Sequence, residues 1–228
     1  MSSNYYLLRN SVNLKTIGRM FPQVFKYEEP YNREAQGSIF GVNYFNGKPI
    51  DPLIPPVYIL APSAKKTDWL SVAFHVPYLC LISNRLLTFF KHFRLPPHQI
   101  FTAKISWKKE LIEDYSLVFF YTIDDRYLDY QKSTFCIARF SHKLQEVEIN
   151  SYEELLKERE KYPSKQVIEE VRVEKMVIQQ DIPFDIIRMQ FSAIGLYISE
   201  NLKTAIEKEG FTGMDFIPLE KLRIGGQF

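Results

Sequence analysis

The chain has 228 residues, of which 46% are hydrophobic and 25% charged, and its formal net charge is +2 at pH 7. These values are typical of a globular protein that buries a core without disulfides or metals, and they exclude a disordered chain. The longest apolar runs, YLCLI and SLVFFY, are too short to span a membrane, and the sequence does not open like a signal peptide. We therefore expect a cytoplasmic protein in which residues 1–228 form a single domain with two lobes, divided near 162–166.

The charge is distributed unevenly along the chain. Residues 1–110 hold 14 Lys/Arg and 6 Asp/Glu, a balance of +8, whereas residues 111–228 hold 15 and 21, a balance of −6. A basic half suits an anionic partner and an acidic half suits a basic protein, although two solvated surfaces explain the same imbalance.

The first half of the chain predicts strands over 5–8 and 57–60, then a buried strand at 77–82 that leads into Ser83. After Ser83, apolar side chains recur at helical spacing up to Phe93, and a double proline follows, so we expect a helix of about three turns. Strands are predicted next over 99–107, 115–123, 133–140 and 143–149. A polar turn, DDRYLDY, separates the second of these from the third.

The second half begins with a clear helix signal at 151–162. Ser151 and Glu154 form a capping box, because the serine hydroxyl can accept the backbone N–H of the residue three positions later. A half-exposed strand is expected over 170–178. Since strands follow one another with few helices between them, the sequence predicts an α+β fold with mostly antiparallel sheets and a few short helices.

The chain contains an internal sequence repeat. Residues 82–93 and 198–209 share four identities in twelve: Ile82 with Ile198, Ser83 with Ser199, Leu86 with Leu202, and Thr88 with Thr204. Each serine is expected to end a strand and N-cap the following helix, with Gly210 as the left-handed C-cap of the second copy. We interpret the repeat as a duplicated strand–helix–strand unit over 81–101 and 196–217. A paired binding site and coincidence are the alternatives.

The second copy also carries a family resemblance. The segment YISENLKTAIEKEGFTGMDFIPL resembles the C-terminal signature of bacterial immunity proteins that are encoded beside polymorphic-toxin genes, and residues 67–122 are similar to the region ahead of that signature. The first copy departs from the pattern, with LPPH where the glycines would stand. The residues that carry the resemblance are Ile198, Ser199, Leu202, Gly210, Thr212, Gly213, Phe216 and Pro218.

The resemblance implies a non-catalytic protein that binds and occludes a cognate protein toxin, without a cofactor and without a nucleic-acid or membrane partner. It leaves the oligomeric state open. If the toxin is a nuclease with a basic cleft, acidic residues of the second half are the expected contacts. These are Asp124, Asp125, Asp129 and Glu174.

Other functions stay open at this point. A serine nucleophile at the strand-to-helix turn is disfavoured, because no glycines flank Ser83 or Ser199. A metal-dependent nuclease or hydrolase would need at least two of Asp124, Asp125, Glu170 and Asp185 to converge. The basic stretch around RLLTFFKHFR and KISWKK has the composition of a nucleic-acid surface, but its rings are expected to face inward. A structural interaction module would show a large apolar patch and self-association.

Overall fold

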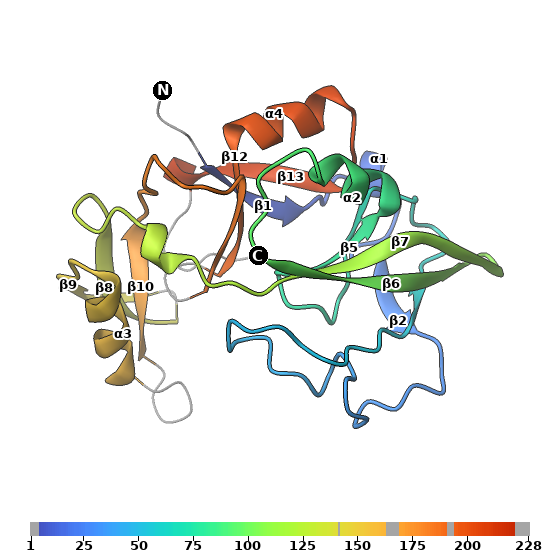
Figure 1. Ribbon diagram of the computed structural model, residues 1–228, viewed down its shortest axis with the longest axis horizontal. Coiled ribbons are helices and arrows are strands. Elements are labelled where there is room, and N and C mark those ends of the chain that lie inside the picture. Colours follow the sequence, from blue (N-terminus) through green and yellow to red (C-terminus); the bar gives the residue numbers. More distant parts are fainter. Residues whose placement is uncertain (1–4, 141, 163–168, 191–193, 222–228) are drawn as a thin grey trace.

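The structure, a computed structural model, describes residues 5–140, 142–162, 169–190 and 194–221. In this part of the chain, thirteen strands form three sheets, and four short α-helices lie against them (Figure 1). The fold is therefore α+β with mostly antiparallel pairing, as the sequence predicts. The proposed boundary at 162–166 falls almost entirely on residues outside the described ones.

The largest sheet has six strands and closes on itself. All its neighbours are antiparallel except β3 and β6. The N–H of Val24 donates to Ser71 O at 3.0 Å and that of Ala73 donates to Val24 O at 2.9 Å, which joins the two outer strands. In order, the strands are β2 (Val24–Tyr27), β3 (Val57–Leu60), β6 (His98–Trp107), β7 (Glu110–Phe120), β5 (Leu79–Ser83) and β4 (Trp69–Leu70).

A four-stranded sheet lies between two hydrophobic cores. Its residues alternate between them: Leu196 and Ile198 face the larger core, which fills the six-stranded sheet, and Tyr197 faces the smaller core. A strand buried on both faces reads as a continuous apolar run, and the sequence LYIS has that character. The strands in order are β11 (Ile186–Met189), β12 (Gly195–Ser199), β1 (Tyr5–Asn10) and β13 (Met214–Pro218).

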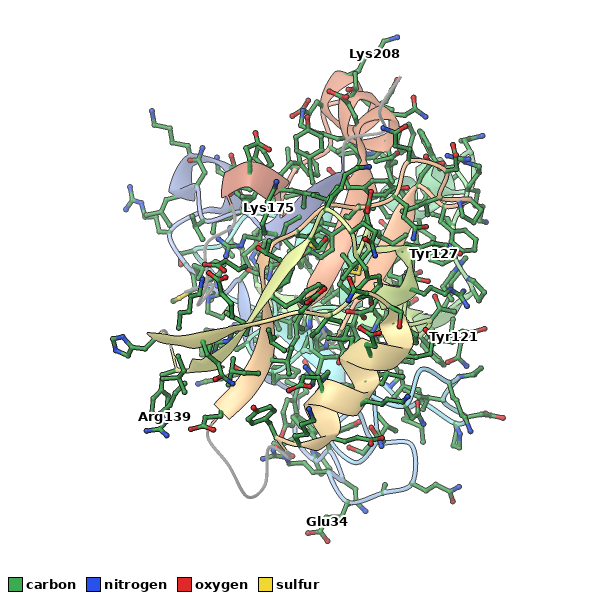
Figure 2. The ribbon with its side chains drawn as sticks, turned by 90° about the vertical axis from the view of Figure 1, so that its left-hand side faces the viewer. Glu34, Tyr121, Tyr127, Arg139, Lys175 and Lys208 are labelled. Atoms are coloured by element: carbon green, nitrogen blue, oxygen red, sulfur yellow. The ribbon has the colours of Figure 1, made fainter. Side chains whose placement is uncertain are left out.

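The third sheet and one helix build the outer side of the smaller core. Figure 2 looks onto this side, with α3 (Tyr152–Glu160) in front and with Arg139 and Lys175 at opposite ends of a strand pair. Leu155 of α3 is fully buried, and the exposed residues of the helix are all charged: Glu153, Glu154, Lys157 and Glu160. The three strands are β10 (Glu169–Lys175), β8 (Thr134–Arg139) and β9 (His142–Val147).

The remaining helices are short. The helix α2 (Asn84–Phe90) has seven residues, fewer than the three turns that the apolar spacing predicts. Only Phe90 of its aromatic residues is fully buried, and Phe89 packs on Phe93 and Phe211. The others are α1 (Leu14–Ile17), α4 (Glu200–Lys208) and the 3₁₀ turns η1 (Asp125–Tyr127) and η2 (Leu219–Lys221).

Two parts of the fold have the same architecture. The strands β4, β5, β7 and β6 pair in the same order and directions as β11, β12, β1 and β13. In both, a helix begins directly after the second strand, α2 after β5 and α4 after β12. We call β4–β5–α2–β6–β7 the first unit and β11–β12–α4–β13–β1 the second. The predicted duplication of 81–101 and 196–217 is thus present as two equivalent structural units.

The equivalence holds at the level of strand register. Ser83 pairs with Tyr115 of β7, and Ser199 pairs with Tyr5 of β1. Strand β1 therefore occupies the place of β7, although β1 stands at the opposite end of the sequence from the rest of its unit. Because a strand needs only the correct edge and direction to complete a sheet, the second unit can take its last strand from a distant segment.

Candidate functional site

The first polar cluster of the fold surrounds the aspartate that precedes β4. Asp68 accepts the hydroxyl of Ser83 at 2.9 Å and two guanidinium N–H groups of Arg85 at 3.1 and 2.9 Å. It also accepts the backbone N–H of Thr212 at 3.0 Å, and Thr212 O accepts the N–H of Trp69. We call Asp68, Ser83, Arg85 and Thr212 the first junction.

The second polar cluster repeats this pattern in the second unit. Asp185 accepts the hydroxyl of Ser199 at 2.8 Å and two guanidinium N–H groups of Arg94, each at 3.2 Å. It also accepts the backbone N–H of Arg94 at 3.0 Å and returns its own N–H to Arg94 O at 2.7 Å. We call Asp185, Ser199 and Arg94 the second junction.

The two junctions connect the units crosswise. Thr212 follows α4 of the second unit, yet it binds Asp68 of the first. Arg94 follows α2 of the first unit, yet it binds Asp185 of the second. Each unit therefore supplies an acceptor to the other and receives a donor from it, so that the two units hold each other in one relative orientation.

The hydrogen bonds keep both aspartates ionised. Burial would raise the pKa of Asp68, but hydrogen bonds from Arg85, Thr212 and Ser83 outweigh it and bring the pKa below its usual value. Burial likewise opposes a lower pKa at Asp185, and the hydrogen bonds from Arg94 and Ser199 again prevail. A carboxylate with a lowered pKa is a weak proton acceptor, so the geometry suits structural anchors better than catalytic bases.

The junction serines are helix caps, as predicted. The hydroxyl of Ser83 accepts the N–H of Leu86 at 3.1 Å, and that of Ser199 accepts the N–H of Leu202 at 3.2 Å. Each hydroxyl donates its proton to an aspartate, so both of its functions are structural. Ser151 caps α3 in the same way, accepting the N–H of Glu154 at 3.1 Å.

The glycines after α4 explain the turn that reaches the first junction. Gly210 has φ +68°, and the N–H groups of Gly210 and Phe211 bond back to Glu207 O and Ile206 O, which is a Schellman cap as the sequence predicts. Gly213 has φ +97°, and a Cβ there would lie 2.0 Å from Trp69 O. Only glycine lets the chain pass this close to β4.

Two of the predicted acidic contacts are wrong. Asp124 and Asp125 are fully buried instead of standing on a polar surface turn. Asp124 accepts the backbone N–H of Arg188 at 3.0 Å, and Asp125 accepts that of Gln190 at 2.9 Å. The physical reason is the strand β11, whose inward N–H groups need acceptors. Burial raises the pKa of Asp124 despite its hydrogen bond from Arg188.

Arg188 is the centre of this buried network and was not singled out from the sequence. Its guanidinium donates to the backbone carbonyls of Phe120, Tyr121 and Tyr44 at 3.2, 3.0 and 2.7 Å, and to the side chain of Gln190. It also stacks on Tyr78, with Cζ 3.5 Å from the ring centroid. Arg188 therefore ties β11 to the end of β7 and to the loop around Tyr44.

The other two predicted contacts stay available at the surface. Asp129 forms an ion pair with Lys132 at 2.7 Å, and Glu174 forms one with Lys143 at 2.7 Å. Their side chains are 20% and 29% exposed. The structure does not gather the four acidic residues into one patch, because two of them face the interior.

Two of the carboxylates that a metal site would need form ion pairs with arginines instead. Glu170 pairs with Arg172, and Asp185 pairs with Arg94. Within the described residues, no group of three or more His, Cys, Asp or Glu side chains is placed to hold a metal ion. Cys80 and Cys136 are both buried free thiols.

Arg94 of the second junction and Tyr5, which pairs with Ser199 on the neighbouring strand, were also not identified from the sequence. Arg94 lies 91 residues from Asp185, and Tyr5 lies 179 residues from the carbonyl that it binds. No local pattern marks such pairs. The signal that was present is the similar spacing of an aspartate ahead of each serine, fifteen residues before Ser83 and fourteen before Ser199.

Comparison with known proteins assigns no family. No protein-family model matches the chain. No curated protein matches it significantly either. No helix in the described part of the chain combines the length and apolar character needed to cross a membrane.

Proposed function

We propose that this protein is a non-catalytic immunity protein that neutralises a cognate bacterial toxin by binding over its active cleft. The support comes from the residues that carry the family resemblance. Ser199 and Leu202 begin the capped helix α4, Gly210 ends it, and Thr212 and Gly213 build the contact with β4. The residues that carry the resemblance are thus the ones that cap α4, end it and connect the second unit to the first.

The single observation that carries the proposal is the crosswise pair of junctions. The Thr212–Asp68 and Arg94–Asp185 hydrogen bonds join the two equivalent units around buried carboxylates. A scaffold held in one arrangement binds a partner without an ordering cost, which is the requirement for occluding a cleft.

The contacts that we assign to a basic cleft are Asp129 and Glu174. Both lie in the lobe of the smaller core, on the η1–β8 connection and on β10. Each is paired with a lysine at the surface, and a cationic group of a partner could replace that lysine at low cost, because exposed ion pairs contribute little.

The test is co-expression with the product of the adjacent gene, followed by purification of the complex. We expect a one-to-one complex and loss of toxicity. Asp129→Lys with Glu174→Lys should weaken the complex at least tenfold. Glu28→Lys with Glu34→Lys is the matched control, because both are exposed acids on the loop between β2 and β3, where Figure 2 labels Glu34.

The outcomes test the proposed function and the assignment of Asp129 and Glu174 separately. If no complex forms and the neighbouring product is harmless when expressed alone, the proposed function is wrong. If the complex forms and the Asp129→Lys, Glu174→Lys variant binds as tightly as the Glu28→Lys, Glu34→Lys control, the function stands and the assignment of Asp129 and Glu174 is wrong.

A further inference from the structure

Six basic side chains lie at α1, at 65–66 and at the turn of the β6–β7 hairpin. The N–H of Arg19 donates to Ser63 O at 3.0 Å, and Lys65 Nζ donates to Lys15 O at 2.7 Å. At the hairpin, Lys66 Nζ and Lys108 Nζ lie 5.1 and 4.1 Å from the centroid of the Trp107 ring. We call this surface the lysine face; it comprises Lys15, Arg19, Lys65, Lys66, Lys108 and Lys109, all exposed, around Trp107.

The charges of the lysine face are not neutralised within the protein. None of its six side chains forms an ion pair with any described residue, whereas Lys104 on the same hairpin pairs with Glu113 at 2.9 Å. The one acidic residue at the hairpin end is Glu110, which stands opposite Trp107. The face therefore carries a concentrated positive potential, although the net charge of the whole chain is only +2.

The hairpin holds its two lysines at a strained turn. Lys108 has φ +51° and Lys109 has φ +72°, and these two residues alone connect β6 to β7. Two-residue turns of this kind favour Asn-Gly, because a side chain in the left-handed region costs about 1–2 kcal/mol. Keeping two lysines there places both charges at the outermost point of the hairpin, and such strain is typical of functional positions.

We infer that the lysine face binds an acidic surface of a partner protein. A surface for single-stranded nucleic acid needs aromatic faces that are free to stack on bases, but the Trp107 ring is already contacted by two ammonium groups. Exposed apolar residues stand beside the charges, Leu14 next to Lys15 and Leu111 near the hairpin end, at 56% and 55% exposure. In a protein interface, apolar side chains of this kind can form the buried centre and the cations the polar rim, where they complement acidic groups of the partner.

This inference rests on the proposed function only in taking the partner to be a protein. The lysine face lies on the larger core's side of the molecule, away from Asp129 and Glu174, which line the smaller lobe. The lysine face is therefore a second contact surface, positively charged where the surface around Asp129 and Glu174 is negatively charged. Charges of this kind act mainly on the association rate, which should fall with added salt.

The test uses poly-L-glutamate as a probe of acidic polypeptide, with binding followed by fluorescence anisotropy at low and moderate salt. The wild-type protein should bind, and the variant Lys66→Glu, Lys108→Glu, Lys109→Glu should bind at least tenfold more weakly, with a smaller salt dependence. The matched control is Lys91→Glu, Lys157→Glu, Lys208→Glu, which changes the net charge equally at exposed lysines on other elements. Circular dichroism verifies that both variants fold.

Three results would overturn the inference. The first is an absence of binding to poly-L-glutamate by the wild-type protein. The second is an equal loss of affinity in the control variant, which would show that net charge alone matters. The third is tighter binding of a twenty-nucleotide oligothymidine than of poly-L-glutamate, which would make the face a nucleic-acid surface.

The same variants separate this inference from the proposed function. If the lysine-face variant neutralises the toxin and associates with it as fast as the wild-type protein, while poly-L-glutamate binding is lost, the face serves an acidic protein other than the toxin. If no toxin complex exists but poly-L-glutamate binds as expected, the proposed function fails and the lysine face remains an acidic-protein site.

Discussion

Tyr5 and Tyr115 occupy equivalent positions in the two units. Tyr5 pairs with Ser199 and donates its hydroxyl to Phe184 O at 2.6 Å, and Tyr115 pairs with Ser83 and donates to Thr67 O at 2.8 Å. Each accepting carbonyl belongs to the residue directly before a junction aspartate. The equivalence therefore includes strand order, helix caps and side-chain hydrogen bonds.

This relationship predicts matched effects of removing the two hydroxyls. Tyr5→Phe and Tyr115→Phe should each lower the free energy of unfolding by about 1–2 kcal/mol, because each leaves a carbonyl without its donor. Urea denaturation measures both values. Tyr121→Phe is the control, since no hydrogen bond of its hydroxyl to a described residue is present, and it should change stability by less than about 0.5 kcal/mol. A neutral result at either Tyr5 or Tyr115 would contradict their equivalence.

The close approach at the first junction predicts different effects at two glycines. Gly213→Ala should destabilise by more than about 3 kcal/mol, because the new Cβ would lie 2.0 Å from Trp69 O. Gly210→Ala should cost only about 1 kcal/mol, since its positive φ is strained for alanine but open space surrounds it. Thermal or urea unfolding of the two variants compares them. Similar losses at both sites would show that the contact between the units is less tight than described.

The buried network predicts a large effect of removing Arg188. Arg188→Met leaves the carbonyls of Phe120, Tyr121 and Tyr44 without that donor, so we expect a loss of about 3–5 kcal/mol or no folded protein. The control is Arg139→Met, because the Arg139–Glu169 pair is exposed and should contribute no more than about 1 kcal/mol. If the two variants are equally stable in urea denaturation, Arg188 does not hold the loop and β7 together.

The buried ring of His75 should make the stability of the protein depend on pH. Burial lowers the pKa of His75 to about 3, although its hydrogen bond to Leu79 O opposes the shift. The folded protein therefore keeps this ring neutral where the unfolded chain, with a pKa near 6.5, takes up a proton. Stability should be complete above that pH and fall by about 2 kcal/mol at pH 5. Urea titrations at pH 7 and 5 should show this loss in the wild-type protein and a smaller loss in His75→Gln. An equal loss in both would assign the pH dependence to other groups.

The sequence determined the local features of this protein. The serine caps, the Schellman glycine and most strands depend on neighbouring residues, so their patterns predict them correctly. The strand β7 starts at Glu110, before the apolar run that predicted it, because three of its first five residues are charged and give no signal of a buried strand. The repeat at 82–93 and 198–209 indicated two equivalent units before any contact was known.

Only the tertiary structure decided which distant groups meet. The polar turn DDRYLDY looked solvated, yet β11 required acceptors for its N–H groups and took Asp124 and Asp125 into the interior. The strand β1 completed a sheet whose other members lie at 186–218, and the arginine partners of Asp68 and Asp185 come from positions without a distinguishing pattern. The reason is physical: caps and periodicity are properties of adjacent residues, whereas a buried carboxylate is satisfied by whichever donor the packed chain brings to it.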